Sequence, residues 1–122
     1  MLFRSAFVAE FVGTMNHLPG ELVGDGMVRV EDQTLRVDGT PAASGSVSVL
    51  VRPEAVVVQA DAGGRSVVQV ATFRGATTRL RLVRDDESIV LADVPSHRAA
   101  DLGVGQRVAI SLLDRPVLLA GS

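Results

Sequence analysis

The chain has 122 residues, 47% of them hydrophobic and none of them cysteine, so one domain is expected, without disulfides, thiol nucleophiles or cysteine-ligated zinc. No apolar run approaches the length of a membrane span and no signal peptide begins the sequence, so we expect a soluble, cytoplasmic protein without direct membrane insertion. The net charge is −2, and the two histidines are isolated, which argues against nucleic-acid binding and against a metal site.

The first predicted element is a short helix from Ala6 to Val12, capped by Ser5 and ended by Gly13. Phe3, Phe7 and Phe11 recur at one-turn spacing along it, which leaves two interpretations. The favoured one is that the aromatic stripe closes the open end of a small barrel. The other is that it forms an interface with a neighbouring domain or a second subunit, because an exposed stripe of this kind would be sticky.

After residue 17 the dominant hydrophobic period is two, which indicates β-strands separated by turns. The predicted strands are Glu21 to Val23, Met27 to Val30, Thr34 to Val37, Ser46 to Arg52, Ala55 to Gln59, Ser66 to Phe73, Thr77 to Arg84, Ile89 to Asp93, Arg107 to Leu112 and Val117 to Leu119. One helical turn is expected near 96–102. Many short strands of this kind predict an all-β fold with one or two OB-like barrels.

A loose internal repeat divides the chain. One meander of hairpins covers residues 18–59 and a longer one covers 66–119. We therefore predict a single domain over 1–122, built of two interleaved OB-like halves at about 14–59 and 66–120.

Side chains that could carry chemistry are few. Arg79 and Arg81 share one face of a predicted strand, where pairing with acids such as Asp93 is favoured over a nucleic-acid surface, since base-stacking aromatics are missing. The acids of 85–87 are interpreted as a solvated turn and not as a cation site. All 12 basic residues are arginine, so the lysine of a phosphate-binding P-loop is absent. No catalytic residue and no cofactor are predicted.

Five motifs in order resemble a known family. They are Phe7-Val8-Ala9-Glu10-Phe11-Val12-Gly13, Asn16-His17-Leu18-Pro19-Gly20, Arg52-Pro53-Glu54, Phe73-Arg74-Gly75 and Gly105-Gln106-Arg107-Val108. Together they are similar to the transport-associated OB (TOBE) domain that follows the nucleotide-binding domain of ABC importer ATP-binding subunits. The Phe-Arg-Gly variant is most similar to importers of the polyamine and ferric-iron branch.

The resemblance implies a non-catalytic regulatory and dimer-stabilising module. Its implied partners are a second copy, the ATPase domain and the membrane permease, with a small-molecule ligand or a regulatory protein as further candidates. The ATPase domain itself is absent from the sequence, so the chain is expected to be either a C-terminal piece or a stand-alone product. In a transporter it would lie at the inner face of the cell membrane.

The resemblance also places candidate residues. Asn16, Arg52, Glu54 and Arg74 are the ligand- or partner-binding candidates, and Phe3, Phe7 and Phe11 are the interface candidates. Arg52 offers a planar fork of donors and Glu54 a pair of acceptors, with Pro53 fixing their relative direction. The simpler interpretation is that the two charges pair with each other or with the backbone.

A second family shares part of this pattern. Small molybdate-binding proteins are built of similar barrels and also contain the Asn-x-Leu-x-Gly motif, here Asn16 to Gly20. Their Ser-Ala-Arg-Asn opening is missing, because Thr14 and Met15 precede Asn16. A stand-alone oxyanion-binding protein is therefore the alternative function, and a plain interaction barrel without a ligand is the third.

Overall fold

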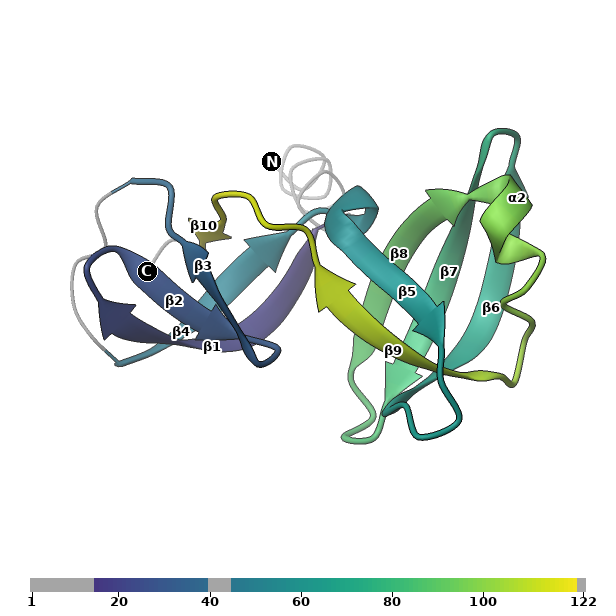
Figure 1. Ribbon diagram of the computed structural model, residues 1–122, viewed down its shortest axis with the longest axis horizontal. Helices are drawn as coiled ribbons and strands as arrows, with labels where there is room; N and C mark the ends of the chain where they lie inside the picture. The colour runs from purple at the N-terminus through teal and green to yellow at the C-terminus, as the bar shows by residue number, and fades with distance from the viewer. Residues whose placement is uncertain (1–14, 40–44, 121–122) are drawn as a thin grey trace, which may run out of the picture.

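The strands of this chain form two lobes that lie side by side (Figure 1). The structure is a computed structural model that describes residues 15–39 and 45–120. The predicted helix from Ala6 to Val12, and with it Phe3, Phe7 and Phe11, lies outside the described residues.

The first lobe is an antiparallel sheet in the order β10-β4-β1-β2-β3. Its strands are β1 (Asn16–Gly24), β2 (Met27–Val30), β3 (Gln33–Arg36), β4 (Gly45–Val51) and β10 (Leu118–Leu119). Val28, Val30, Leu35 and Val49 are almost completely buried in it.

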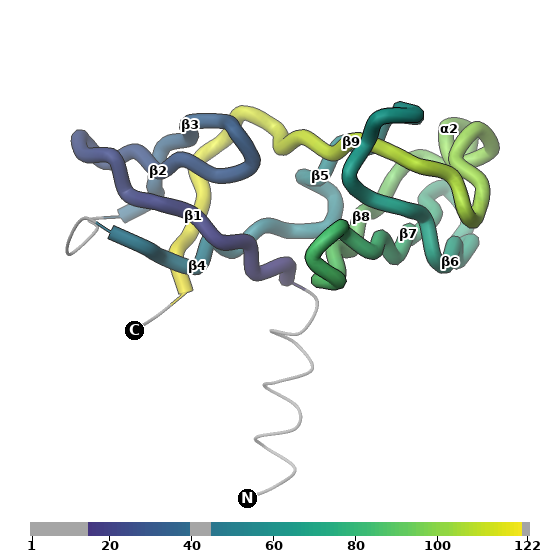
Figure 2. The backbone as a smooth tube through the Cα atoms, turned by 90° about the horizontal axis from the view of Figure 1, so that it is seen from below, coloured from purple at the N-terminus to yellow at the C-terminus, as the bar shows by residue number. Residues whose placement is uncertain are grey.

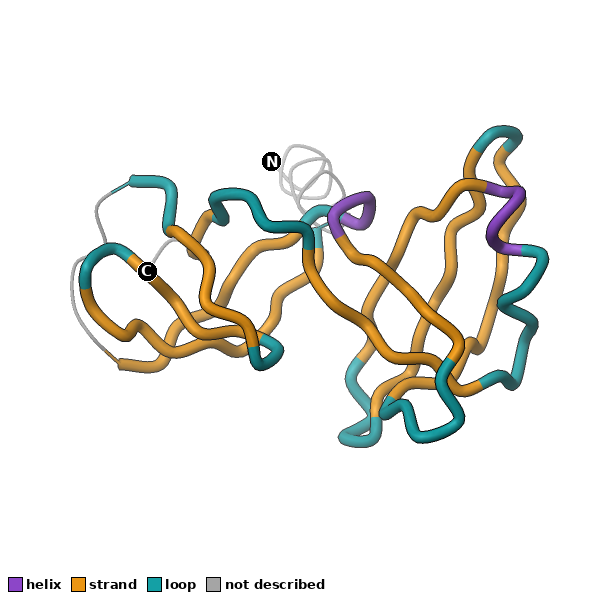
Figure 3. Tube along the Cα trace, in the orientation of Figure 1, coloured by secondary structure: helices purple, strands orange, loops and turns teal. Residues whose placement is uncertain are grey.

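The second lobe is an antiparallel sheet in the order β5-β9-β6-β7-β8. Its strands are β5 (Val56–Ala60), β6 (Ser66–Arg74), β7 (Thr77–Arg84), β8 (Ile89–Pro95) and β9 (Arg107–Leu112). Val68, Leu80, Leu82, Val90 and Val108 form its centre. Each lobe is a small, curved, OB-like sheet, so the predicted all-β class is confirmed (Figure 3).

Strand β7 shows why the alternating pattern predicted these elements correctly. Thr78, Leu80 and Leu82 are buried, whereas Arg79 and Arg81 point to the other face. Successive side chains of a strand point to opposite faces, so one face can be buried as a whole. Removing each leucine side chain from water contributes about 1.5 to 3 kcal/mol to stability. The alternation therefore fixes which face of the sheet meets the core.

The first strand is longer than expected, since β1 begins at Asn16 and not at Glu21. Pro19 lies inside it, opposite Ser48 of β4. The pairing of β1 with β2 starts only at Glu21, so Pro19 has a partner strand on one side alone, a position that tolerates a residue without an N–H.

Gly20 in the same strand is required by close packing. A Cβ at this position would lie 2.7 Å from a methyl carbon of Val49 and 3.1 Å from the Arg29 carbonyl oxygen. The glycine of the Asn-x-Leu-x-Gly motif therefore allows neighbouring chain segments to approach closely.

The chain passes between the lobes twice (Figure 2), so the observed sheets do not have the same boundaries as the expected halves. It leaves β4 through the 3-10 turn η1 (Pro53–Ala55), so β5 joins the second sheet although the predicted first half extended to about residue 59. It returns after β9, and β10 pairs with β4 of the first sheet although the predicted second half extended to about 120. Proline ends β4 and redirects the chain, so the lobe boundary falls at the Arg-Pro-Glu corner.

The predicted helical turn near 96–102 is present in a shortened form. Helix α2 covers only Ser96–Ala99, after which turns lead to the buried Leu102. Among the described residues no helix is long and apolar enough to span a membrane.

Candidate functional site

The Arg-Pro-Glu corner lies at the junction of the lobes. Pro53 and Ala55 are buried, and the Ala55 N–H donates to the Arg52 carbonyl oxygen at 2.9 Å. Arg52 and Glu54 are exposed and form no ion pair with each other in the part of the chain that the structure describes. Local backbone bonding thus fixes the corner, and the two charges face different hollows.

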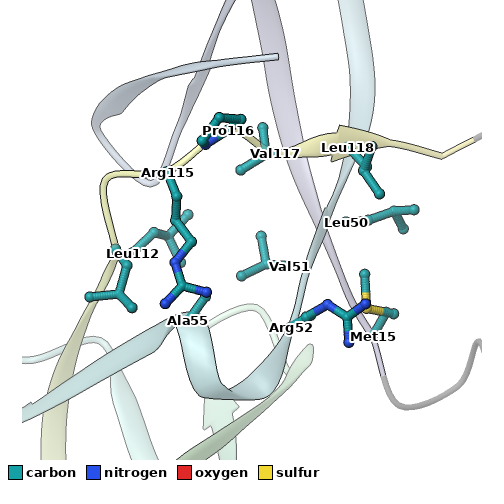
Figure 4. A pocket seen from close by; sticks show the side chains of 11 residues that line it. Met15, Leu50, Val51, Arg52, Ala55, Leu112, Arg115, Pro116, Val117 and Leu118 are labelled. Carbon is teal, nitrogen blue, oxygen red and sulfur yellow. The ribbon is translucent and has the colours of Figure 1, made fainter. Parts of the chain in front are cut away.

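Arg52 lines a cleft of about 240 Å³ between the two crossing segments. We call it the hinge cleft. It is lined by Met15, Leu50, Val51, Arg52, Ala55, Leu112, Leu113, Arg115, Pro116, Val117 and Leu118. Figure 4 shows Arg115 extending from the returning segment toward Ala55, while the Arg52 guanidinium lies near Met15. The cleft combines an apolar lining from both lobes with two cationic groups.

Glu54 lines a smaller hollow of about 100 Å³ on the second lobe, together with Asp93 and Arg98. Beside it Arg79 donates through Nε and Nη2 to the two carboxylate oxygens of Asp93, at 2.8 and 2.9 Å. This bidentate bond to Asp93 raises the pKa of the Arg79 guanidinium above its usual value, and the nearby Glu54 carboxylate adds to the effect. The predicted pairing of the arginine row with Asp93 is confirmed for Arg79, whereas Arg81 donates to Gln69 at 2.9 Å.

Asn16 is buried and joins the two lobes. Its Nδ2 donates to the Leu91 carbonyl oxygen, and its Oδ1 accepts from the Leu91 N–H, both at 2.8 Å. Asn16 belongs to β1 of the first sheet and Leu91 to β8 of the second. The amide that was predicted as a ligand or partner contact is therefore engaged in a structural bond between sheets.

Two further contacts of this kind were not predicted from the sequence. Gln33 in β3 donates to the Leu112 carbonyl oxygen at 2.9 Å and accepts from its N–H at 2.7 Å. Arg84 at the end of β7 pairs with Glu31 in the β2–β3 turn, with Nη1 2.5 Å from Oε2. The only sequence signal was a polar side chain beside a tight turn, which does not identify a partner 53 to 79 residues away.

Arg74 lies far from the corner, at the exposed turn between β6 and β7. Its neighbour Phe73 is 73% exposed, the largest exposed apolar side chain of the described residues. Strand β6 pairs with β9 only at Ser66 and Val67, so the segment 69–74 has no partner strand on that side within the described ranges. Asn16, by contrast, pairs with Val51 directly before Arg52, so among the described candidates Asn16, Arg52 and Glu54 lie near the lobe junction and Arg74 lies at the β6–β7 turn.

Asp85, Asp86 and Glu87 are exposed in the turn between β7 and β8. Asp86 accepts from the Ser88 hydroxyl at 2.5 Å and from the Ser88 N–H at 3.0 Å, and the hydroxyl bond is the main reason that the pKa of its carboxyl is lowered. Within the described residues no group of histidine and acidic side chains is arranged to hold a metal ion.

Comparison with known proteins shows the family of this chain. The TOBE domain family matches residues 49–119, which include the Arg-Pro-Glu corner and both crossing segments. The chain belongs to the TOBE domain family.

Relatives of this TOBE domain are ATP-binding proteins of importers. The sulfate/thiosulfate import ATP-binding protein CysA of Xanthomonas campestris is 40% identical over 88% of this chain and 31% of the relative. The Fe(3+) import protein FbpC of Brucella abortus is 39% identical over 49% of this chain and 18% of the relative. The spermidine/putrescine import ATP-binding protein PotA of Clostridium acetobutylicum is 26% identical over 90% of this chain and 31% of the relative. The TOBE domain thus spans a third or less of the length of these relatives.

A solved structure has the same fold. The cytoplasmic molybdate-binding protein ModG superposes with a TM-score of 0.65 at 16% identity, over 88% of this chain and 96% of its own. At this identity the likeness concerns the arrangement of strands alone.

Proposed function

We propose that this TOBE domain is the non-catalytic regulatory and dimer-forming part of an ABC importer ATP-binding subunit. The observation that carries the proposal is the match of 88% of the chain to 31% of an import ATP-binding protein at 40% identity. The chain contains no lysine, so a P-loop that reaches nucleotide phosphates is not encoded in it. In this proposal the hydrolytic site, the permease and the position at the inner face of the membrane belong to the larger transporter.

The bonds between the lobes support a role in transmitting motion. Asn16, Gln33 and Glu31 each connect the first lobe to the second through a polar contact. Buried or partly buried polar contacts of this kind favour one relative orientation, because leaving them unpaired is costly. A module whose lobes move together can pass a displacement at one surface to a partner bound at another.

The open edge of β6 supports self-association. Val70 and Phe73 are 44% and 73% exposed, and the edge of 69–74 presents backbone groups without a strand partner in the described part of the chain. Unpaired edges and exposed aromatic side chains favour pairing with another chain. We infer that a second copy of this domain covers the edge, with Arg74 at the rim of the contact.

Light scattering across a concentration series tests the proposal. We expect the unsubstituted chain to be a dimer. The double variant Val70→Thr and Phe73→Ser should have an apparent mass closer to that of the monomer. Val23→Thr is the matched control, because Val23 is 49% exposed on the first lobe and away from this edge. A monomer at every concentration would contradict dimer formation. A thermal shift on adding Mg²⁺ and ATP would contradict the non-catalytic assignment.

The oxyanion alternative keeps one supporting observation, the similarity in fold to ModG. Against it, the amide of Asn16, the residue shared with the molybdate-binding motif, is bonded to Leu91. The regulatory proposal therefore accounts for more of the structure.

A further inference from the structure

The hinge cleft is lined by two arginines that have no carboxylate partner within 15–39 and 45–120. Among the described residues neither Arg52 nor Arg115 takes part in a salt bridge, whereas Arg79, Arg84 and Arg107 do. Both arginines line the same cleft. Two guanidinium groups beside one hollow favour an anion, because each can donate planar pairs of hydrogen bonds to a carboxylate.

The remaining lining is apolar. Val51, Leu112 and Val117 are buried side chains at the back of the cleft, and Leu118 is 48% exposed. A fully hydrated inorganic anion gains nothing from such a surface, whereas a hydrocarbon group gains about 25 cal/mol for each Å² that it buries. The two kinds of lining together select a ligand with a charged end and an apolar body.

The size of the cleft limits that body. A cavity of about 150 Å³ is enough for benzene in a protein interior. The hinge cleft measures about 240 Å³ and therefore has space for one ring or a short branched chain together with a carboxylate. We propose that the hinge cleft binds a small organic carboxylate with an apolar body, whose carboxylate bonds to Arg52 and Arg115.

The position of the cleft gives this ligand a consequence. Arg52 lies in the segment that leaves the first lobe, and Arg115 lies in the segment that returns to it. A ligand held by both arginines ties the two crossing segments together and stabilises one orientation of the lobes. That regulatory meaning rests on the proposed function, whereas the binding site rests on the cleft alone.

Titration calorimetry on the full chain tests the inference with phenylacetate as the probe. We expect saturable binding of phenylacetate, and binding at least tenfold weaker for 2-phenylethanol, which lacks the charge, and for acetate, which lacks the ring. Arg52→Met and Arg115→Met are each expected to weaken phenylacetate binding about tenfold. Arg29→Met is the matched control, because Arg29 is exposed on β2 and does not line the cleft, and it should leave binding unchanged.

Four results would overturn the inference. They are no saturable binding of phenylacetate, equal binding of 2-phenylethanol, sulfate binding as tight as that of phenylacetate, and methyl NOEs in the ligand-free protein between residues 1–14 and Leu112 or Leu118. The last would show that the chain itself fills the cleft. If the chain dimerises but binds no carboxylate, only the inference about the hinge cleft is contradicted. If the chain is a monomer that binds phenylacetate, only the proposed dimer formation is contradicted.

Discussion

The side-chain amide of Asn16 forms both of its hydrogen bonds with one residue, Leu91, whose N–H and carbonyl oxygen lie 2.8 Å from Oδ1 and Nδ2. The two residues are 75 positions apart and belong to different sheets. The contact therefore replaces a missing backbone partner of β8 by a side chain from the other lobe. A primary amide is suited to this role, because it carries a donor and an acceptor side by side.

Asn16→Ala should lower the free energy of unfolding by about 2 to 3 kcal/mol, because two backbone groups of Leu91 lose their partners in a poorly hydrated position. Urea denaturation followed by circular dichroism measures the change. His17→Ala is the control, since His17 is an exposed neighbour in the same strand, and we expect an effect below about 0.5 kcal/mol. A loss of similar size in both variants would show that the Asn16 contact adds no stability.

The Glu31–Arg84 pair should show a coupling free energy of about 1 kcal/mol in a double-mutant cycle of Glu31→Gln and Arg84→Met. The two side chains are only 13% and 18% exposed, so solvent screens them less than a surface pair. Arg107 and Asp85 provide the comparison, because they are 3.8 Å apart and more than half exposed, and their cycle should give about 0.2 kcal/mol or less. Equal coupling free energies in the two cycles would contradict the expectation that burial strengthens the Glu31–Arg84 pair.

Asp32→Gly should stabilise the fold by about 0.5 kcal/mol, because Asp32 has a φ of 62° in the β2–β3 turn, where glycine is favoured. Thermal unfolding of both forms would reveal the gain. The same substitution at Asp38, which has no positive φ, should destabilise the fold by increasing the freedom of the unfolded chain. If Asp32→Gly lowered the melting temperature as much as Asp38→Gly, turn strain at Asp32 would be disproved.

The Asp86 carboxyl should titrate below its usual pKa, mainly because the Ser88 hydroxyl bonds to the ionised form. A lowered folded-state pKa means that this contribution to stability is present above the usual aspartate pKa and is lost as the pH falls through the folded-state value. Carboxyl carbon NMR shifts measure the titration. Ser88→Ala should raise the Asp86 pKa toward 3.8, and an unchanged value would contradict the assigned cause.

Molybdate and tungstate should leave the melting temperature unchanged. Asn16 is engaged with Leu91, and the lining of the hinge cleft is largely apolar, so neither place suits a compact, strongly hydrated oxyanion. A thermal-shift series with both anions, and with sulfate as the control anion, measures this. Stabilisation by molybdate and tungstate but not by sulfate would favour the oxyanion alternative over the regulatory proposal.

The alternating sequence predicted most strands because burial follows a local rule. The pattern Thr78, Leu80, Leu82 identifies a buried face without knowledge of the neighbouring strand. Strand pairing follows no such rule, so the sequence did not predict that β5 pairs with β9 or that β10 pairs with β4. The role of Gln33 was not predictable either, because its partner Leu112 is distant in sequence and contributes only backbone atoms.

The Arg-Pro-Glu corner could be found from the sequence, but the directions of its charges could not. Proline predicted where β4 ends. The separation of Arg52 and Glu54 into two hollows depends on which lobe packs on each side of η1, and that is decided by tertiary structure. Arg115 was overlooked because it belongs to no motif, although it lines the hinge cleft with Arg52.

The return of the chain to β4 through β10 has a consequence for synthesis on the ribosome. All strands of the second lobe lie in the continuous stretch 56–112, so that lobe can complete its pairing while the chain is still being extended. The first lobe must wait for Leu118 and Leu119, which emerge after every strand of the second lobe, before the outer edge of β4 is covered. The half made first is therefore finished last, and a β4 edge left open during translation exposes the nascent chain to aggregation.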